Sequence, residues 1–207
     1  MEVIFFDPLN ITVPVKRVYT RLGYVQNKTK LGSSQRDKIE GFIEQAKSLL
    51  SLKGAAIFLS TEKIEAGQIS LSKGVCFNSK ALAELLAGCP EVLLMAATAG
   101  DKIIQAIQED SSGKNVMRAV VFDAVASETT DSGLDWITNY FNSQLRRKNM
   151  RLTQRRFSAG YGDFSLDNQK TIHKILELEK IGVALSPEYL LIPEKTVTAV
   201  CGVRSNY

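Results

Sequence analysis

The spacing of apolar residues along the chain predicts several helices. In the segment that runs from about 33 or 34 to 52, Ile39, Ile43 and Ala46 recur at helical spacing, and Ser34 is a suitable N-cap. Further predicted helices cover 13–24, 79–89, 101–110, about 114–148 and 165–182. The predicted packed face of the longest one is Val116, Val120, Ala124, Ser127, Thr130, Leu134, Ile137 and Phe141.

Other segments have the short apolar runs of strands. Residues 3–6 form one such run, and two β-rich runs within 55–72 flank a Glu-Ala-Gly turn, which predicts a hairpin. The continuous apolar run at 91–100 is typical of a buried central strand. The segment 151–158 is expected to be extended, and 187–203 to hold two final strands.

The order of these elements favours one fold class. Predicted helices and strands alternate irregularly, and no internal repeat or low-complexity linker interrupts them. We therefore predict an α+β fold rather than a doubly wound one. Its antiparallel or mixed twisted sheet would be packed with several helices, including one long central helix. A single domain is expected over residues 1–207.

Composition excludes several classes of protein. Apolar residues make up 44% of the 207 residues and charged residues 23%, which are ordinary values for a globular core. No apolar run approaches the roughly 18–20 residues that cross a bilayer. Glu2 and Asp7 flank only a very short apolar run, unlike a signal peptide, so a cytoplasmic location is expected.

Cysteine and histidine are too sparse for several common kinds of site. Cys76, Cys89 and Cys201 are widely spaced and odd in number, and no CxxC pair occurs. Neither a structural zinc site nor a disulfide framework is expected, and buried free thiols are the simpler interpretation. A hydrolytic triad would have to use the single histidine, His173, which we expect on a helix flank.

The net charge of +4 is concentrated in one segment that contains no acid. Its basic residues are Arg146, Arg147, Lys148, Arg151, Arg155 and Arg156. One interpretation is a solvated helix end, where cations suit the helix dipole. The other is a surface for an anionic partner, either nucleic acid or an acidic protein. Interleaved aromatic residues are absent except for Phe157, which argues against single-strand binding.

Two weaker candidates for chemistry precede this segment. Gly100 comes just before a predicted helix start, where backbone N–H groups can bind an anion, but a tight turn also explains it. Glu128 lies within the long helix between Ser127 and Thr130, residues that helix interiors disfavour. It either belongs to a solvated polar face or offers a carboxylate to an amine-bearing ligand.

The strongest candidate is the stretch 155–169, RRFSAGYGDFSLDNQ. Arg156 can form a bidentate pair with a carboxylate. Gly160 and Gly162 allow positive φ and close approach of a ligand to the main chain. Tyr161 offers a ring face and a phenol. The residues indicate a site for a carboxylate joined to a planar group, and an ordinary structural turn is the alternative.

This stretch, Arg-x-[Ala/Ser]-x-Gly-Tyr followed by a helix, resembles the activation domain of vitamin B12 (cobalamin)-dependent methionine synthase, and most of all its stand-alone forms. The other stretches that carry the resemblance are TRLGY, ATAG, DAVASE and LLIPEKTVTAVCGV. Together they span most of the chain in an order consistent with that family, and the GYGD segment is the most specific of them.

The resemblance implies a function and a set of ligand contacts. The family's domain binds S-adenosylmethionine and supports the reductive methylation, or reactivation, of cob(II)alamin in methionine biosynthesis. Arg156 would bind the ligand's carboxylate, main-chain groups of Ser158 would contact the ligand, and Tyr161 would pack or hydrogen-bond beside it. Gly160 would let the ligand approach the main chain. Glu128 corresponds to an acid that the family uses for the ligand's amine.

The chain also departs from the family pattern. Ala159 stands where proline is common, and Cys201 where an aromatic residue is expected in one wall of the site. The DxHxxG cobalamin motif and a zinc-binding cysteine cluster are both absent. The resemblance therefore implies a corrinoid held by a separate methyltransferase, with a flavodoxin-like electron donor. A module of the same fold that docks on a corrinoid protein without S-adenosylmethionine is the alternative.

Overall fold

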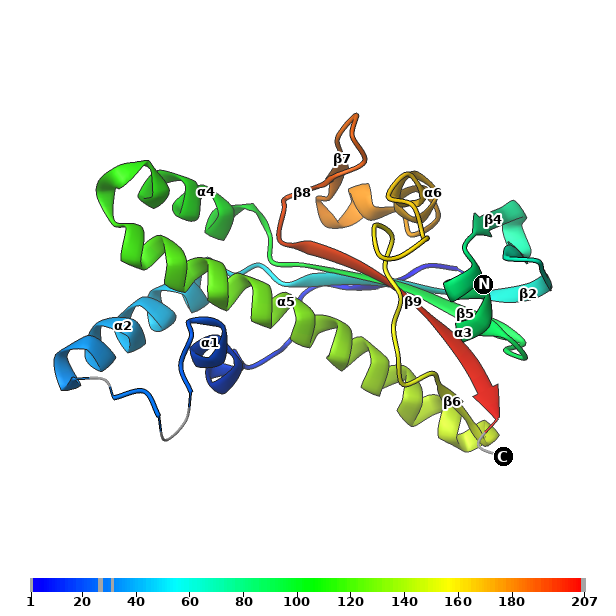
Figure 1. Cartoon of the computed structure of the whole chain (residues 1–207), viewed down its shortest axis with the longest axis horizontal. Helices are drawn as coiled ribbons and strands as arrows, with labels where there is room; N and C mark the ends of the chain where they lie inside the picture. The colour runs from blue at the N-terminus through cyan, green and yellow to red at the C-terminus, as the bar shows by residue number, and fades with distance from the viewer. Residues whose placement is uncertain (1, 26–27, 31, 206–207) are drawn as a thin grey trace.

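A twisted antiparallel sheet forms the centre of the molecule (Figure 1). The computed structural model describes residues 2–25, 28–30 and 32–205. The other residues of the expected single domain, 1, 26–27, 31 and 206–207, lie outside the described residues. The sheet has seven strands in the order β4-β3-β2-β5-β9-β6, with β1 also paired to β2. Their bounds are β1 (Ile4–Phe6), β2 (Lys53–Glu65), β3 (Gln68–Leu71), β4 (Val75–Asn78), β5 (Glu91–Thr98), β6 (Met150–Leu152) and β9 (Thr196–Ser205).

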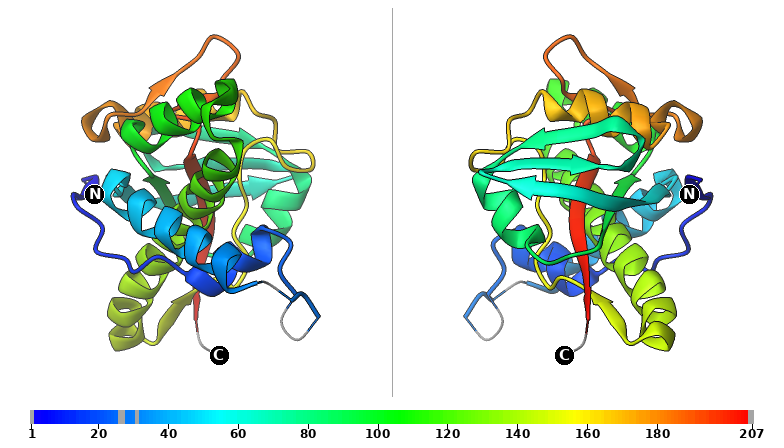
Figure 2. Two further views of the ribbon diagram at one scale, coloured as in Figure 1. Left: turned by 90° about the vertical axis from the view of Figure 1, so that its left-hand side faces the viewer. Right: turned by 90° about the vertical axis from the view of Figure 1, so that its right-hand side faces the viewer.

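The pairing confirms the predicted α+β class and selects the antiparallel alternative, because each of these strand pairs is antiparallel. The predicted hairpin is β2–β3, which turns at Ala66 and Gly67 with φ of 50° and 87°. Strand β5 is buried from its second residue onward, as its apolar run predicts. Figure 2 shows β2, β3 and β4 side by side at one end of the molecule.

The described part of the chain forms six α-helices. They are α1 (Val15–Arg21), α2 (Ser33–Leu49), α3 (Lys80–Leu86), α4 (Asp101–Glu109), α5 (Val116–Leu145) and α6 (Asn168–Ile175). The 30-residue α5 is the predicted long helix. Its C-terminal half packs on one face of the sheet, and its N-terminal half packs against α1, α2 and α4 (Figure 1). Helices α3 and α6 pack on the opposite face.

The predicted packed face of α5 is only partly correct. Thr130, Leu134 and Ile137 are buried as expected, but Val116 and Val120 are 58% and 53% exposed. The first turns of α5 pack against α2 and α4 instead of the sheet, so a different set of α5 residues is buried there. The helix begins after Asn115, whose side chain accepts a hydrogen bond from the backbone N–H of Arg118 (3.2 Å).

Other boundaries also differ from the predictions. Ser34 lies inside α2, whose N-cap is Gly32, and no side chain caps the helix there. The predicted helix at 165–182 is divided, because the chain turns at Glu177 (φ 51°) and continues as a 3-10 turn over Leu178–Ile181. The short strands β4 and β7 (Ala184–Leu185) were not predicted. Strand β7 pairs with β8 (Leu191–Ile192), the first of the two final strands.

All three cysteines are free thiols, but only two of them are buried. Cys89 and Cys201 lie in the core, while Cys76 is exposed, so the expectation is wrong for Cys76. Residues of β4 alternate between buried and exposed, and Cys76 occupies an outward position. None of the described helices combines the length and apolar character needed to cross a membrane.

Candidate functional site

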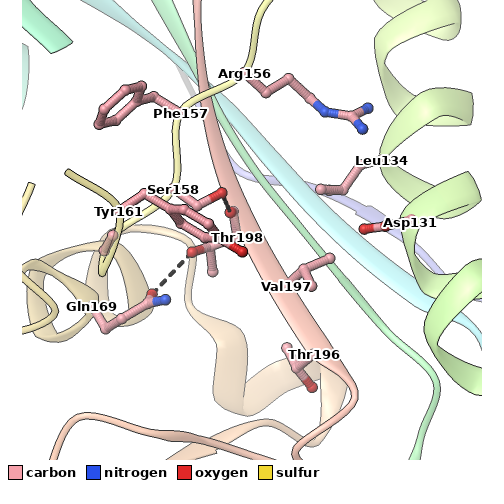
Figure 3. Close-up of a pocket in the computed structure, with 11 residues that line it drawn as sticks. Asp131, Leu134, Arg156, Phe157, Ser158, Tyr161, Gln169, Thr196, Val197 and Thr198 are labelled. Carbon is pink, nitrogen blue, oxygen red and sulfur yellow. Dashed lines mark hydrogen bonds between the residues drawn. The ribbon is translucent and has the colours of Figure 1, made fainter. Parts of the chain in front are cut away.

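A cavity of about 430 Å³ lies between α5, the edge of β9 and the segment 156–161, beside the start of α6 (Figure 3). It is lined by Asp131, Leu134, Arg156, Phe157, Ser158, Ala159, Tyr161, Gln169, Thr196, Val197 and Thr198. This volume is within the range of about 300–1,000 Å³ that is usual for small-molecule sites. Both polar and apolar side chains reach into the cavity from facing elements.

The cavity exists because β6 covers only one end of the β9 edge. Pairing between β6 and β9 involves the last three residues of β9, 203–205. Farther along, Phe157 and Val200 exchange two backbone hydrogen bonds of 3.0 and 2.8 Å. The Ser158 hydroxyl then donates to the carbonyl of Thr198 (2.7 Å), and the chain turns away from the strand. The start of β9 is thus left facing the cavity.

The turn that follows holds Tyr161 at the rim of the cavity. Gly160 and Gly162 have φ of 93° and 56°, which favours glycine at both positions. The backbone N–H of Gly160 donates to the carbonyl of Phe164 (2.7 Å), and Tyr161 forms a β-bridge with Phe164. Phe164 is fully buried whereas Tyr161 is 70% exposed. The turn is therefore anchored in the core and presents an aromatic ring outside it.

Asp163 ties the same turn to helix α3. Its carboxylate accepts hydrogen bonds from the hydroxyl of Ser79 and the backbone N–H of Lys80, both at 2.6 Å. Ser79 in turn caps α3 by accepting from the backbone N–H of Leu82 (2.9 Å). The hydrogen bond from Ser79 lowers the pKa of Asp163. The aspartate of the GYGD sequence thus has a structural partner outside the cavity.

A row of charges lies along α5 on the other side of the cavity. Nη1 of Arg156 donates to Asp135 (2.7 Å), and Arg17 of α1 contacts the second oxygen of the same carboxylate (2.8 Å). Burial alone would raise the pKa of Asp135, but hydrogen bonds from Arg17 and Arg156 outweigh it and lower the pKa. Asp131, one turn earlier on α5, lines the cavity itself, and partial desolvation raises its pKa.

The structure brings together three of the five residues predicted to hold a ligand. Arg156, Ser158 and Tyr161 all line the cavity. Gly160 belongs to the same turn but is not among the lining residues. Glu128 lies outside the cavity, because it is one turn before Asp131 on α5 and pairs with Arg21 of α1 (3.0 Å). All five assignments as ligand contacts stay predictions.

Several lining residues were not predicted. Asp131 was not singled out from the sequence as a site residue, although its three-residue spacing from Glu128 places both acids on one side of a helix. Gln169 and Thr198 come from distant segments and form a buried hydrogen bond between their side chains (3.0 Å). No local pattern could have joined them. Cys201 is buried in the core beneath α5 and does not line the cavity.

Gly100 is explained by a turn rather than by an anion site. Its φ is 82°, and a Cβ atom there would come within 2.8 Å of the Cβ of Ser51. Its backbone N–H donates to the hydroxyl of Thr98 (3.2 Å). The close passage of the chain at Ser51 and the positive φ both require glycine, which supports the tight-turn interpretation.

Comparison with solved structures places this fold in a known class. The structure is similar to one described as "Crystal Structure of the MetH Reactivation Domain bound to AdoHcy", with a TM-score of 0.71. The match covers 100% of this chain and 80% of the other, and the two sequences are 10% identical. It confirms the fold that the sequence resemblance implied. No protein-family model and no curated protein matches the sequence.

Proposed function

We propose that this protein binds S-adenosylmethionine in the cavity beside β9 and acts as a reactivation domain for a corrinoid methyltransferase on a separate polypeptide. The observation that carries the proposal is the presence of a cation, Arg156, and a carboxylate, Asp131, in the lining of one cavity that Tyr161 also borders. The fold supports it, because the similar MetH reactivation domain was solved with AdoHcy bound. Residues of the predicted motif, Arg156, Ser158 and Tyr161, also line the cavity.

The cavity offers a partner for each charged end of an amino-acid ligand. A guanidinium has five N–H donors, and the structure commits one of those of Arg156 to Asp135, so others can donate to the ligand's carboxylate. We assign the ligand's ammonium group to Asp131 rather than to Glu128. Asp131 lines the cavity, whereas Glu128 is paired with Arg21 outside it.

The remaining groups suit the uncharged part of the ligand. Tyr161 lines the rim of the cavity and offers a large exposed ring for stacking against adenine. Ser158 lines the cavity, and we assign its main-chain groups to the ligand contact that the resemblance implies. In this arrangement the protein binds and orients the methyl donor. The cobalt that accepts the methyl group would belong to the partner, with the electron supplied by a flavodoxin-like donor.

Two adjacent arginines provide the test. Isothermal titration calorimetry with S-adenosylmethionine and S-adenosylhomocysteine should show saturable binding to the wild type. Arg156→Ala should weaken binding by about tenfold or more, because a hydrogen bond to a charged group contributes about 1.5–3 kcal/mol. Arg155→Ala is the matched control, since Arg155 does not line this cavity, and it should leave the affinity within about twofold.

The proposal would be wrong if the wild type bound neither ligand even with the corrinoid partner present. Equal losses in the Arg155 and Arg156 variants would also contradict it. In that case binding would depend on general positive charge rather than on the cavity.

A ligand-independent docking module of the same fold is the second candidate. It is favoured by the ion pairs Arg21–Glu128 and Arg156–Asp135, which already engage polar groups that the ligand was predicted to use. Ala159 in place of proline points the same way. Capture of a corrinoid protein equally by the wild type and by Arg156→Ala, without any calorimetric signal for S-adenosylmethionine, would select this function.

A further inference from the structure

A second cavity, of about 300 Å³, lies at the other end of β9 and is dominated by arginine. It is lined by Leu85, Arg151, Leu152, Thr153, Gln154, Arg155 and Arg204. Three arginines, from β6, from β9 and from the segment that follows β6, therefore line one small space. None of the lining residues carries a carboxylate. The cavity is distinct from the proposed S-adenosylmethionine site, because the two share no lining residue.

Strand register forces two of these arginines together. Arg151 of β6 is directly opposite Arg204 of β9 in the antiparallel pair, so their side chains extend from the same face of the sheet. The neighbouring pair, Leu152 and Val203, is buried against the C-terminal half of α5. Because side chains alternate between the faces of a strand, the arginine pair lies on the face away from α5.

This pairing is unfavourable in the free protein. Like charges placed directly opposite on adjacent strands destabilise a sheet. Arg155 adds a third positive charge to the same cavity. Within residues 2–25, 28–30 and 32–205, neither Arg155 nor the cross-strand pair has an acidic side chain within ion-pair distance. By contrast, the adjacent Arg156 is neutralised by Asp135.

We propose that this cavity binds a phosphate group, either as the free ion or as a phosphate monoester. Planar guanidinium groups bind phosphate oxygens through pairs of charge-assisted hydrogen bonds. An anion placed between Arg151, Arg204 and Arg155 would replace their repulsion by attraction to a common centre. A concave site lined by three arginines suits a compact, multiply charged oxyanion better than an extended polymer, which needs a groove that follows its backbone.

Titration with inorganic phosphate tests the proposal. Binding to the whole chain would be measured by calorimetry at constant ionic strength, with chloride as the balancing anion. Arg204→Gln and Arg151→Gln should each weaken phosphate binding by about tenfold or more. Arg147→Gln is the matched control, because it removes one charge from the same basic region but does not line the cavity, and it should change the affinity by less than about twofold.

A second measurement guards against misfolded variants. Because Arg204→Gln removes a like-charge contact with Arg151, its urea midpoint without phosphate and at low salt should equal or exceed that of the wild type. Phosphate should then raise the midpoint of the wild type and of Arg147→Gln by similar amounts, and that of Arg204→Gln by much less. A lower midpoint for Arg204→Gln without phosphate would contradict the repulsion on which the proposal rests.

The source of the phosphate is resolved by comparing ligands. Tighter binding of glycerol phosphate than of inorganic phosphate would identify an esterified group, and the reverse order would identify the free ion. The absence of saturable phosphate binding up to about 50 mM, far weaker than an arginine-lined site should show, would overturn the proposal. A single-stranded oligonucleotide that bound with equal losses in Arg147→Gln and Arg204→Gln would also overturn it, and would identify a polyanion surface.

Discussion

Phe164 is the residue through which the candidate ligand turn is anchored in the core, and its truncation should be severe. The side chain is fully buried and meets the ring of Phe77 edge-on, with centroids 5.2 Å apart and an interplanar angle of 80°. Replacing a buried phenylalanine by alanine costs about 3–5 kcal/mol of unfolding free energy. For a chain of this size, each kcal/mol lowers Tm by about 2–4 °C, so Phe164→Ala should lower it by about 6–20 °C.

Urea unfolding followed by far-UV circular dichroism would measure this loss. Tyr161→Ala is the control, since the two residues form a β-bridge within one turn but Tyr161 is 70% exposed. Its unfolding free energy should stay within about 0.5 kcal/mol of the wild type, while its affinity for S-adenosylmethionine should fall. Phe164→Leu, which keeps most of the apolar volume, should recover part of the stability.

The reasoning would be refuted if Phe164→Ala lowered the unfolding free energy by less than about 1 kcal/mol, because truncation of a fully buried phenylalanine should cost more than that. Equal destabilisation by Tyr161→Ala would refute it as well. That result would mean that the exposed ring, rather than the buried one, holds the turn in place.

Three further predictions follow from single contacts. Asp163→Ala should weaken ligand binding at pH 7, because it removes the hydrogen bonds that hold the turn to α3. The pKa of Asp163 is lowered in the folded state, so in the wild type these bonds should persist at neutral pH and be lost as the pH falls through that lowered pKa. Binding measured over a pH series would show this loss. In a thiol titration, Cys76 should react in the native state, while Cys201, with a pKa raised to about 11 by burial, should react only after unfolding. Gly202→Ala should cost about 1–3 kcal/mol by urea unfolding, and Cys89→Ala should relieve it, because the new Cβ would be 2.4 Å from that sulfur.

Local patterns were sufficient for three of the main elements. The hairpin β2–β3 was predicted from two β-rich runs on either side of a Glu-Ala-Gly turn, strand β5 from a continuous apolar run, and α5 from the helical spacing of its apolar residues. The buried side of α5 was not, because α2 and α4 rather than the sheet cover its first turns and leave Val116 and Val120 outside. Spacing shows that a helix has an apolar side, but the neighbouring elements decide which residues that side includes.

The same distinction applies to the candidate site. Arg156, Ser158 and Tyr161 belong to one short stretch of sequence, so one motif was enough to find them together. Asp131 could be recognised only after the fold had placed its turn of α5, rather than that of Glu128, against the cavity. One helical turn decides which acid lines the cavity and which acid pairs with α1.

Arg155 and Arg156 are consecutive residues beside β9 that belong to different proposed sites. Arg156 lines the first cavity and Arg155 the second. The chain bends at Gln154 and Arg155, and one dipeptide supplies a cation to each site. Arg156→Ala should therefore weaken the binding of S-adenosylmethionine and leave that of phosphate unchanged, and Arg155→Ala should do the reverse. Either proposal can fail in this pair of experiments while the other stands.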